Sequence, residues 1–75
     1  MKYYLISIQF LSDGSNPVSI LGYDTRESVL SAFHSTLASN YANENVIKFD
    51  AMVITEFGKV EKQEYWARPI SEITE

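Results

Sequence analysis

Cysteine is absent from this chain of 75 residues. Its absence excludes disulfide bonds and any zinc or iron–sulfur site built on cysteine ligands. Histidine occurs once, as His34, so a cluster of histidine ligands is excluded too. The three glycines are too far apart to form a glycine-rich phosphate loop. We therefore expect neither a metal nor a cofactor.

Long hydrophobic runs and clusters of basic residues are also missing. No apolar run approaches the ~20 residues of a membrane span, and the chain opens with a strand-like alternation instead of a signal peptide. The net charge is −4 and the six Lys and Arg residues are scattered, which disfavours binding to phosphate backbones. We expect a cytoplasmic protein that binds neither membranes nor nucleic acid.

Catalytic arrangements are not apparent. His34 could act as an acid or base near neutral pH, but no nearby carboxylate in the sequence orients it. We interpret His34 as a residue that packs and hydrogen-bonds at the border of an apolar face. Asp50 and Glu56 share a strand face but would lie about 20 Å apart, too far for a catalytic carboxylate pair. We expect that the protein is not an enzyme.

The composition is that of one small folded domain. Apolar residues make up 45% of the chain and charged residues 21%, which is ordinary for a globular protein. We expect a domain over residues 1–70, followed by a flexible tail at 71–75. A chain this short buries a modest core, and association with a partner is a common way to bury more surface.

Alternating apolar residues predict four strands, at 2–10, 18–23, 46–57 and 60–67, with a tight turn at 57–59. In the first strand the more apolar of the two alternating sets is Tyr4, Ile6, Ile8 and Phe10. We expect that set to face the helix.

Residues 24–41 predict the single helix. Asp24 is the expected N-cap, and Glu27 could complete a capping box. An apolar stripe follows at every fourth residue, consisting of Val29, Phe33, Leu37 and Tyr41.

Two strands, a helix and two strands give an α+β fold of the type ββαββ. The sheet order 2-1-3-4 makes every neighbouring pair antiparallel and places the two most apolar strands in the centre. The order 1-2-4-3 is antiparallel too, but it would place those strands at the edges. We prefer the first order.

One helix covers only one face of such a sheet, so the other face should expose large apolar side chains. The expected interface residues on that face are Tyr3, Leu5, Leu21, Tyr23, Met52, Ile54 and Trp66. A contiguous apolar patch on a small protein marks an interaction site, and a homodimer is the commonest assembly. The alternative is that these side chains lie singly among charged residues and need no partner.

The helix carries a second candidate surface. Ser28, Ser31, Ser35 and Ser39 line one side, and no charged residue occurs between Ser28 and Asn43. The row is either a serine-rich solvent face or a small-residue face that allows another chain to approach closely. We include Ser31 and Ser35 among the candidate interface residues.

One resemblance involves most of the chain. The residues from Ala32 to Ser39, the opening Lys-Tyr-Tyr strand and the later Glu64-Tyr65-Trp66 look like small uncharacterised proteins of phages and mobile elements of Gram-positive bacteria. The resemblance implies a phage or prophage origin and no known activity.

Two non-enzymatic hypotheses follow, and a third is a small enzyme that uses His34 in a pocket with a second polar group. The first is a non-enzymatic protein-interaction module that self-associates through its open sheet face or its serine face. The alternative is an acidic phage-type inhibitor that occupies the nucleic-acid site of a host protein. The alternative requires a continuous acidic stripe on the folded surface.

Overall fold

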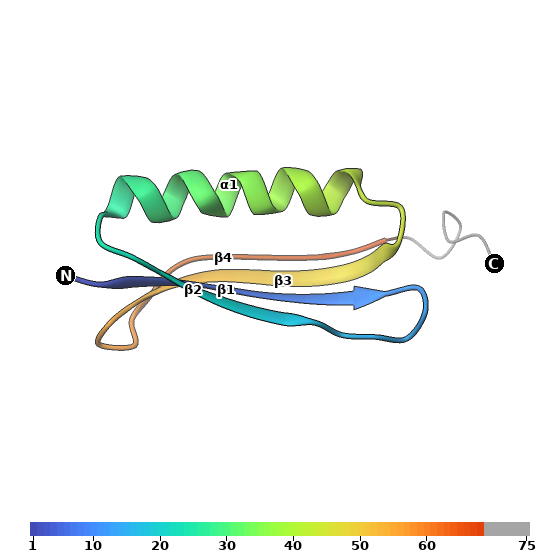
Figure 1. Ribbon diagram of the computed structural model, residues 1–75, viewed down its shortest axis with the longest axis horizontal. Coiled ribbons are helices and arrows are strands. Elements are labelled where there is room, and N and C mark those ends of the chain that lie inside the picture. Colours follow the sequence, from blue (N-terminus) through green and yellow to red (C-terminus); the bar gives the residue numbers. More distant parts are fainter. Residues whose placement is uncertain (69–75) are drawn as a thin grey trace.

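The computed structural model describes residues 1–68 as a four-stranded antiparallel sheet with one helix on one face (Figure 1). The elements in chain order are β1 Tyr3–Leu11, β2 Val18–Tyr23, α1 Arg26–Ala42, β3 Val46–Thr55 and β4 Val60–Ala67. The predicted ββαββ fold of the α+β class is confirmed. The end of the expected domain at residue 70 and the expected tail at 71–75 lie outside the described residues.

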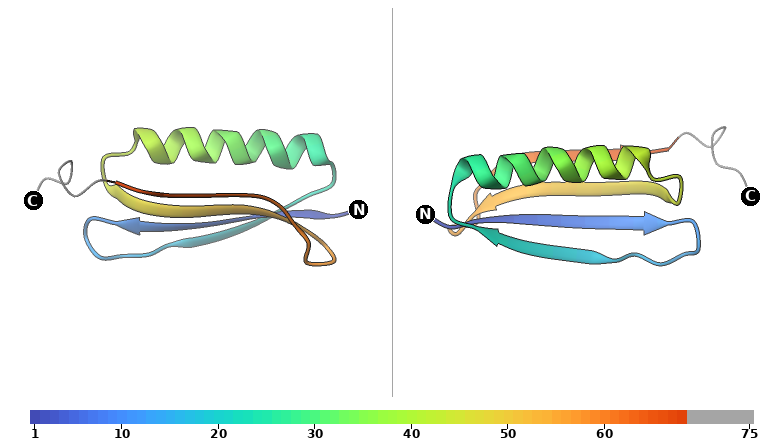
Figure 2. Two further views of the ribbon diagram at one scale, coloured as in Figure 1. Left: turned by 180° about the vertical axis from the view of Figure 1, so that it is seen from behind. Right: turned by 45° about the horizontal axis from the view of Figure 1, so that its top comes forward.

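The sheet order is β2-β1-β3-β4, as predicted. Strands β1 and β3 are the longest and pair along their whole length, from Tyr3 opposite Thr55 to Leu11 opposite Val46. Two further views show α1 lying along one face of this sheet (Figure 2). Within residues 1–68, no element covers the other face.

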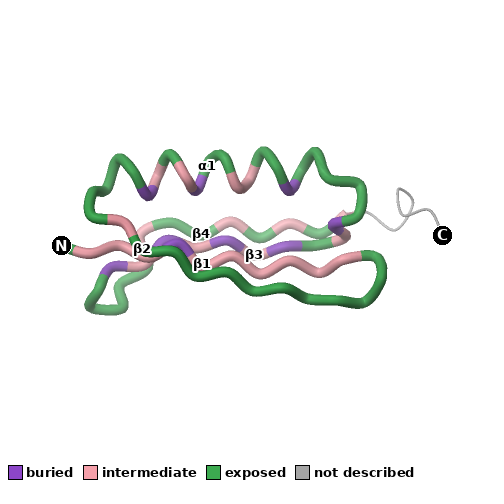
Figure 3. The backbone as a smooth tube through the Cα atoms, viewed as in Figure 1, coloured by how far each residue is buried: buried purple, intermediate pink, exposed green. Residues whose placement is uncertain are grey.

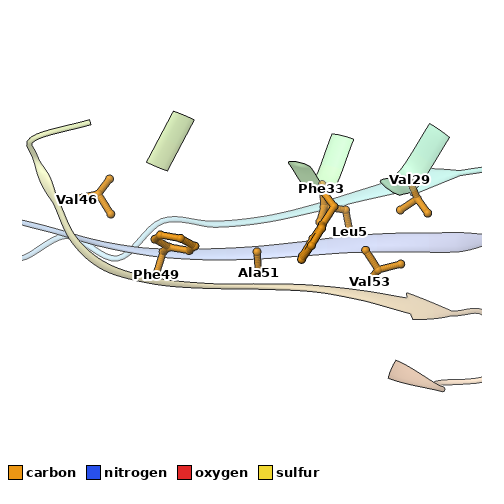
Figure 4. Packing of buried hydrophobic residues seen from close by; sticks show 7 residues of the cluster. All are labelled: Leu5, Val29, Phe33, Val46, Phe49, Ala51 and Val53. Atoms are coloured by element: carbon orange, nitrogen blue, oxygen red, sulfur yellow. The ribbon is translucent and has the colours of Figure 1, made fainter. Parts of the chain in front are cut away.

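The core lies between α1 and the two central strands (Figure 4). Strand β3 supplies alternate side chains from Phe49 to Val53, and α1 supplies Val29 and Phe33. The buried apolar residues are Leu5, Val29, Phe33, Val46, Phe49, Ala51 and Val53. Each is at most 3% exposed, so these residues define which side of every strand faces the helix.

The predicted orientation of β1 is wrong. Leu5 pairs with Val53 on β3, and both side chains are buried under α1. Because side chains alternate along a strand, Tyr4, Ile6, Ile8 and Phe10 must point to the uncovered face. The count of apolar residues misled the prediction, since the uncovered side of β1 is more apolar than the covered side.

The start of α1 also differs from the prediction. Thr25, not Asp24, is the N-cap, and its Oγ1 accepts the backbone N–H of Ser28 at 3.1 Å. Asp24 instead bonds Lys2. Glu27 lies in the first turn, where its negative charge interacts favourably with the helix dipole. It does not complete a capping box on Asp24, because Thr25 is the N-cap.

The buried stripe of α1 does not end on Tyr41. Asn40 is 1% exposed, whereas Tyr41 is 45% exposed. A helix turns by about 100° per residue, so Asn40 returns to within about 20° of Val29 while Tyr41 lies about 120° away. The Asn40 carboxamide oxygen accepts a hydrogen bond from Gln9 Nε2. This bond gives each of these two polar atoms a partner between the helix and β1.

Strand β3 ends at Thr55, two residues before the predicted end. The Thr55 hydroxyl accepts hydrogen bonds from the backbone N–H groups of Phe57 and Lys59, and so starts the turn. Gly58 has a φ of 86° in this turn, a conformation that favours glycine. The predicted tight turn at 57–59 is confirmed.

Candidate interaction surface

The uncovered face of the sheet is apolar across all four strands. Cross-strand pairs place the open-face side chains in rows; one row runs from Ile20 through Ile6 to Met52. The large apolar residues of this open face are Tyr4, Ile6, Ile8, Phe10, Val18, Ile20, Met52, Ile54, Val60 and Tyr65. We call this set the open face.

Exposure on the open face is greatest toward the sheet edges. Val18 is 59% exposed, Ile20 63%, Val60 50% and Tyr65 62%. The central side chains, such as Ile6 and Met52, are half-buried by their neighbours in the sheet. The surface is therefore a continuous patch and not a set of isolated apolar side chains, which is typical of an interaction site.

The few polar groups on the open face are satisfied within the sheet. Lys48 Nζ lies 4.6 Å from the centre of the Phe10 ring, within the range of a cation–π interaction. Gln63 Nε2 donates to the Asp50 carboxylate at 3.2 Å. Asp50 lies inside the patch, between Ile8 and Tyr65, so its hydrogen bond with Gln63 provides a partner for the carboxylate there.

An ion pair borders the open face where β2 leads into α1. Lys2 Nζ lies 2.9 Å from Asp24 Oδ1. The hydrogen bond and charge of Lys2 lower the pKa of Asp24 below 3.8, and Asp24 raises the pKa of Lys2 above 10.5. Both groups are exposed, so the pair contributes little to stability.

The lowered pKa of Asp24 predicts the sign of a pH dependence. The pair stabilises the fold above the ordinary carboxyl pKa of 3.8 and stops doing so as the pH falls through the lowered value. It is also lost as the pH rises through the raised pKa of Lys2. Asp24→Asn should therefore lower the unfolding free energy slightly at pH 7 and make no difference at about pH 2. Urea unfolding at both pH values measures this.

A matched control for Asp24→Asn is Glu44→Gln, which neutralises an exposed acid in the connection between α1 and β3. The pH-dependent difference should be absent in that variant. An equal difference for Asp24→Asn at both pH values would contradict the ion-pair explanation.

The expected interface residues divide between the two faces of the sheet. Met52 and Ile54 lie on the open face, as predicted. Tyr3, Leu5, Leu21 and Tyr23 lie on the helix side, which corrects their expected position. Leu21 is still 51% exposed, because it lies on the edge strand β2.

Trp66 is also on the helix side of the sheet. It pairs with Phe49 across β3 and β4, and its ring contacts Tyr41 edge to face, at 5.2 Å between ring centres. The Arg68 guanidinium lies 4.9 Å from the Trp66 ring, and its Nη2 donates to the backbone oxygen of Asn43. Trp66 therefore packs within the domain, whereas the prediction placed it on the uncovered face of the sheet.

The sequence interpretation missed most of the open face, namely the residues of β1, Val18 and Ile20 on β2, and Val60 and Tyr65 on β4. No local signal in the sequence identifies the β1 residues of this face. In the antiparallel register, Leu5 cannot share a face with Met52 or Ile54 when it lies opposite Val53. The register itself depends on tertiary contacts, so the alternation alone did not reveal the conflict.

The serine face and His34 lie on the exposed side of α1. Ser31 and Ser35 are exposed, as expected for a face turned away from the sheet. His34 is exposed as well, and its ring meets Phe33 edge to face at 5.5 Å between ring centres. We predicted that His34 packs and hydrogen-bonds. The structure shows the packing contact with Phe33.

Acidic residues are distributed around the described part of the chain. Asp13 lies in the turn after β1, Glu44 follows α1, Glu56 follows β3 and Asp50 lies on the open face. Among residues 1–68, no three His, Asp or Glu side chains gather as a possible metal site. No helix in the same residues has both the length and the apolar character needed to cross a membrane.

Comparison with models of protein families, with curated proteins and with solved structures returns no match. The resemblance to proteins of phages and mobile elements stays a prediction. The open face is the feature of the described residues on which a functional proposal can be based.

Proposed function

We propose that this protein is a non-enzymatic interaction module that self-associates through the open face. The observation that carries the proposal is the absence of any covering element over ten apolar side chains within residues 1–68. Domains are built of packed layers that bury apolar sheet faces. A second copy would supply the missing layer and give the order helix, sheet, sheet, helix.

The charges around the open face suit a second copy of the same chain. Lys2 and Asp24 lie together at one end of the patch, while Lys48 and Asp50 lie toward the other. Each pair combines one cation with one anion, and the Asp50 carboxylate, which lies inside the patch between Ile8 and Tyr65, accepts a hydrogen bond from Gln63. Two identical faces related by a twofold axis can meet without opposing large charges of one sign.

A lysine in the open face tests the proposal. Ile54→Lys should reduce the mass in solution, because two copies would have to bury the ammonium group without a partner. The wild type should have a mass of at least twice the 8.6 kDa of one chain. Light scattering over a concentration series measures both masses, and circular dichroism establishes that the variant is folded.

Ser35→Lys is the matched control, since it adds the same charge to the exposed serine face of α1. It should leave the mass unchanged. A reduced mass for Ser35→Lys with an unchanged mass for Ile54→Lys would transfer the interface to the helix. A monomeric wild type at every concentration would refute self-association.

The acidic-inhibitor hypothesis receives no comparable support. It requires a continuous acidic stripe, and the acidic residues of the described chain lie at both ends and on both faces of the sheet. We therefore do not propose it.

A further inference from the structure

Within Val18–Tyr23, the outer edge of β2 has no charge, no proline and no register irregularity, although Pro17 lies directly before the strand. Its six residues, Val18–Tyr23, include no charged side chain. Five of the six are exposed, and the strand is the most exposed of the sheet (Figure 3). Natural edge strands are usually protected by charges, prolines or bulges, because free backbone groups attract another strand.

The opposite edge, β4, has such protection. It carries Lys62 and Glu64, and its register with β3 is interrupted between Val53 and Ile54. Glu61 at this irregularity lies 3.6 Å from Arg26 on the helix. The contrast between the two edges indicates that β2 is the one available for pairing.

The backbone groups on the free edge of β2 can be identified. The Gln9 N–H donates to the Pro17 carbonyl at 3.0 Å, and residues that bond toward a given neighbour alternate along a strand. Ser19, Leu21 and Tyr23 therefore bond toward β1. Val18, Ile20 and Gly22 direct their N–H and C=O groups away from the sheet.

These three residues are arranged symmetrically about Ile20. In an antiparallel pair of two β2 strands, Ile20 can bond to Ile20 of the partner subunit, and Val18 can bond to Gly22 of the partner subunit. Every outward N–H and C=O group of one strand then meets its complement.

The area of the open face supplies a second argument. Four strands at about 4.8 Å spacing and nine paired residues at about 3.4 Å each give a flat area of order 600 Å². A standard interface removes about 800 Å² from each partner. The flat area of one open face is of the same order as this value, and two sheets joined edge to edge double it to about 1,200 Å², so a face-to-face assembly of four chains buries more surface than one of two.

We propose that β2 pairs antiparallel with β2 of a second copy, so that two chains form one continuous eight-stranded sheet. Both helices then lie on the same side, and the half-exposed Leu21 side chains fill the space between them. The further assembly into four chains, with two such sheets face to face, rests on the proposed function of the open face. The edge pairing itself does not.

Ile20→Pro tests the edge pairing. Proline removes the outward N–H of Ile20 and leaves the bonds between β2 and β1 intact, since Ile20 does not bond toward β1. Ile20→Ala is the matched control, because it shortens the side chain and retains the N–H. The wild type should have four times the 8.6 kDa of one chain, and Ile20→Pro should have half the wild-type mass. Ile20→Ala removes the same open-face side chain as Ile20→Pro, so a larger mass of Ile20→Ala than of Ile20→Pro at equal concentration measures the contribution of the outward N–H.

Comparison with Ile54→Lys separates the two interfaces, with circular dichroism showing that each variant is folded. If Ile54→Lys and Ile20→Pro each halve the mass in solution, and the variant with both substitutions is a monomer, both interfaces are supported. If Ile54→Lys reduces the mass but Ile20→Pro does not, the edge pairing is wrong and the proposed function stands. If Ile20→Pro reduces the mass but Ile54→Lys does not, the edge pairing is supported and the open-face interface is refuted. Equal effects of Ile20→Pro and Ile20→Ala, or a monomeric wild type, overturn the edge pairing.

Discussion

Leu5→Lys should prevent the domain from folding, whereas the same change at the next residue, Ile6→Lys, should leave a folded protein. Leu5 is 3% exposed and faces the helix beside Val53. A lysine there would lose the burial of the leucine, worth about 2–5 kcal/mol in comparable truncations, and would also place a charge in the core. A domain of this length has a total stability of about 4–11 kcal/mol.

Ile6 is the control because it lies on the same central strand with its side chain on the open face. Its lysine variant should retain the far-ultraviolet circular dichroism of the wild type and dispersed amide resonances, with a reduced mass in solution. A folded Leu5→Lys together with an unfolded Ile6→Lys would mean that the helix covers the opposite face of the sheet.

Phe49→Ala should lower the free energy of unfolding by about 3–5 kcal/mol, the range for a buried phenylalanine. Phe49 is fully buried on β3. Its ring lies 5.3 Å from that of Tyr41, edge to face, and 5.8 Å from that of Trp66. Alanine would leave a cavity beside the two remaining rings, Tyr41 and Trp66, in the cluster that holds the end of α1 against β3 and β4.

Phe57→Ala is the matched control, since Phe57 is 80% exposed in the turn after β3. Its effect should stay within about 0.5 kcal/mol, as for most surface substitutions. Urea unfolding followed by tryptophan fluorescence measures both variants, and Trp66 reports directly on the cluster. Similar losses of stability at Phe49 and Phe57 would disprove the assignment of Phe49 to the core.

Much of the fold was predictable because its signals are local. The period-two alternation of β3, the four-residue spacing from Val29 to Phe33 and the turn residues around Gly58 each depend on a few neighbouring amino acids. Short connections then left two all-antiparallel sheet orders, and the preference for apolar strands in the centre selected the correct one.

The candidate site was only partly predictable. Met52 and Ile54 were placed on the open face because Phe49, Ala51 and Val53 form a convincing buried set on β3. Strand β1 has apolar residues on both sides, so its alternation is equally compatible with either orientation. The prediction chose the more apolar side for the core, and the structure shows the opposite.

The sequence alone determined the number, type and order of the elements, because backbone preferences and side-chain periods act over a few residues. The tertiary structure decided which side of β1 and β2 lies under α1, because that choice depends on the register of Leu5 against Val53. It also placed Asn40 in the core beside Gln9 and Trp66 beside Tyr41. Those positions depend on contacts between residues distant in the chain, where the packing of whole faces outweighs the hydrophobicity of any one residue.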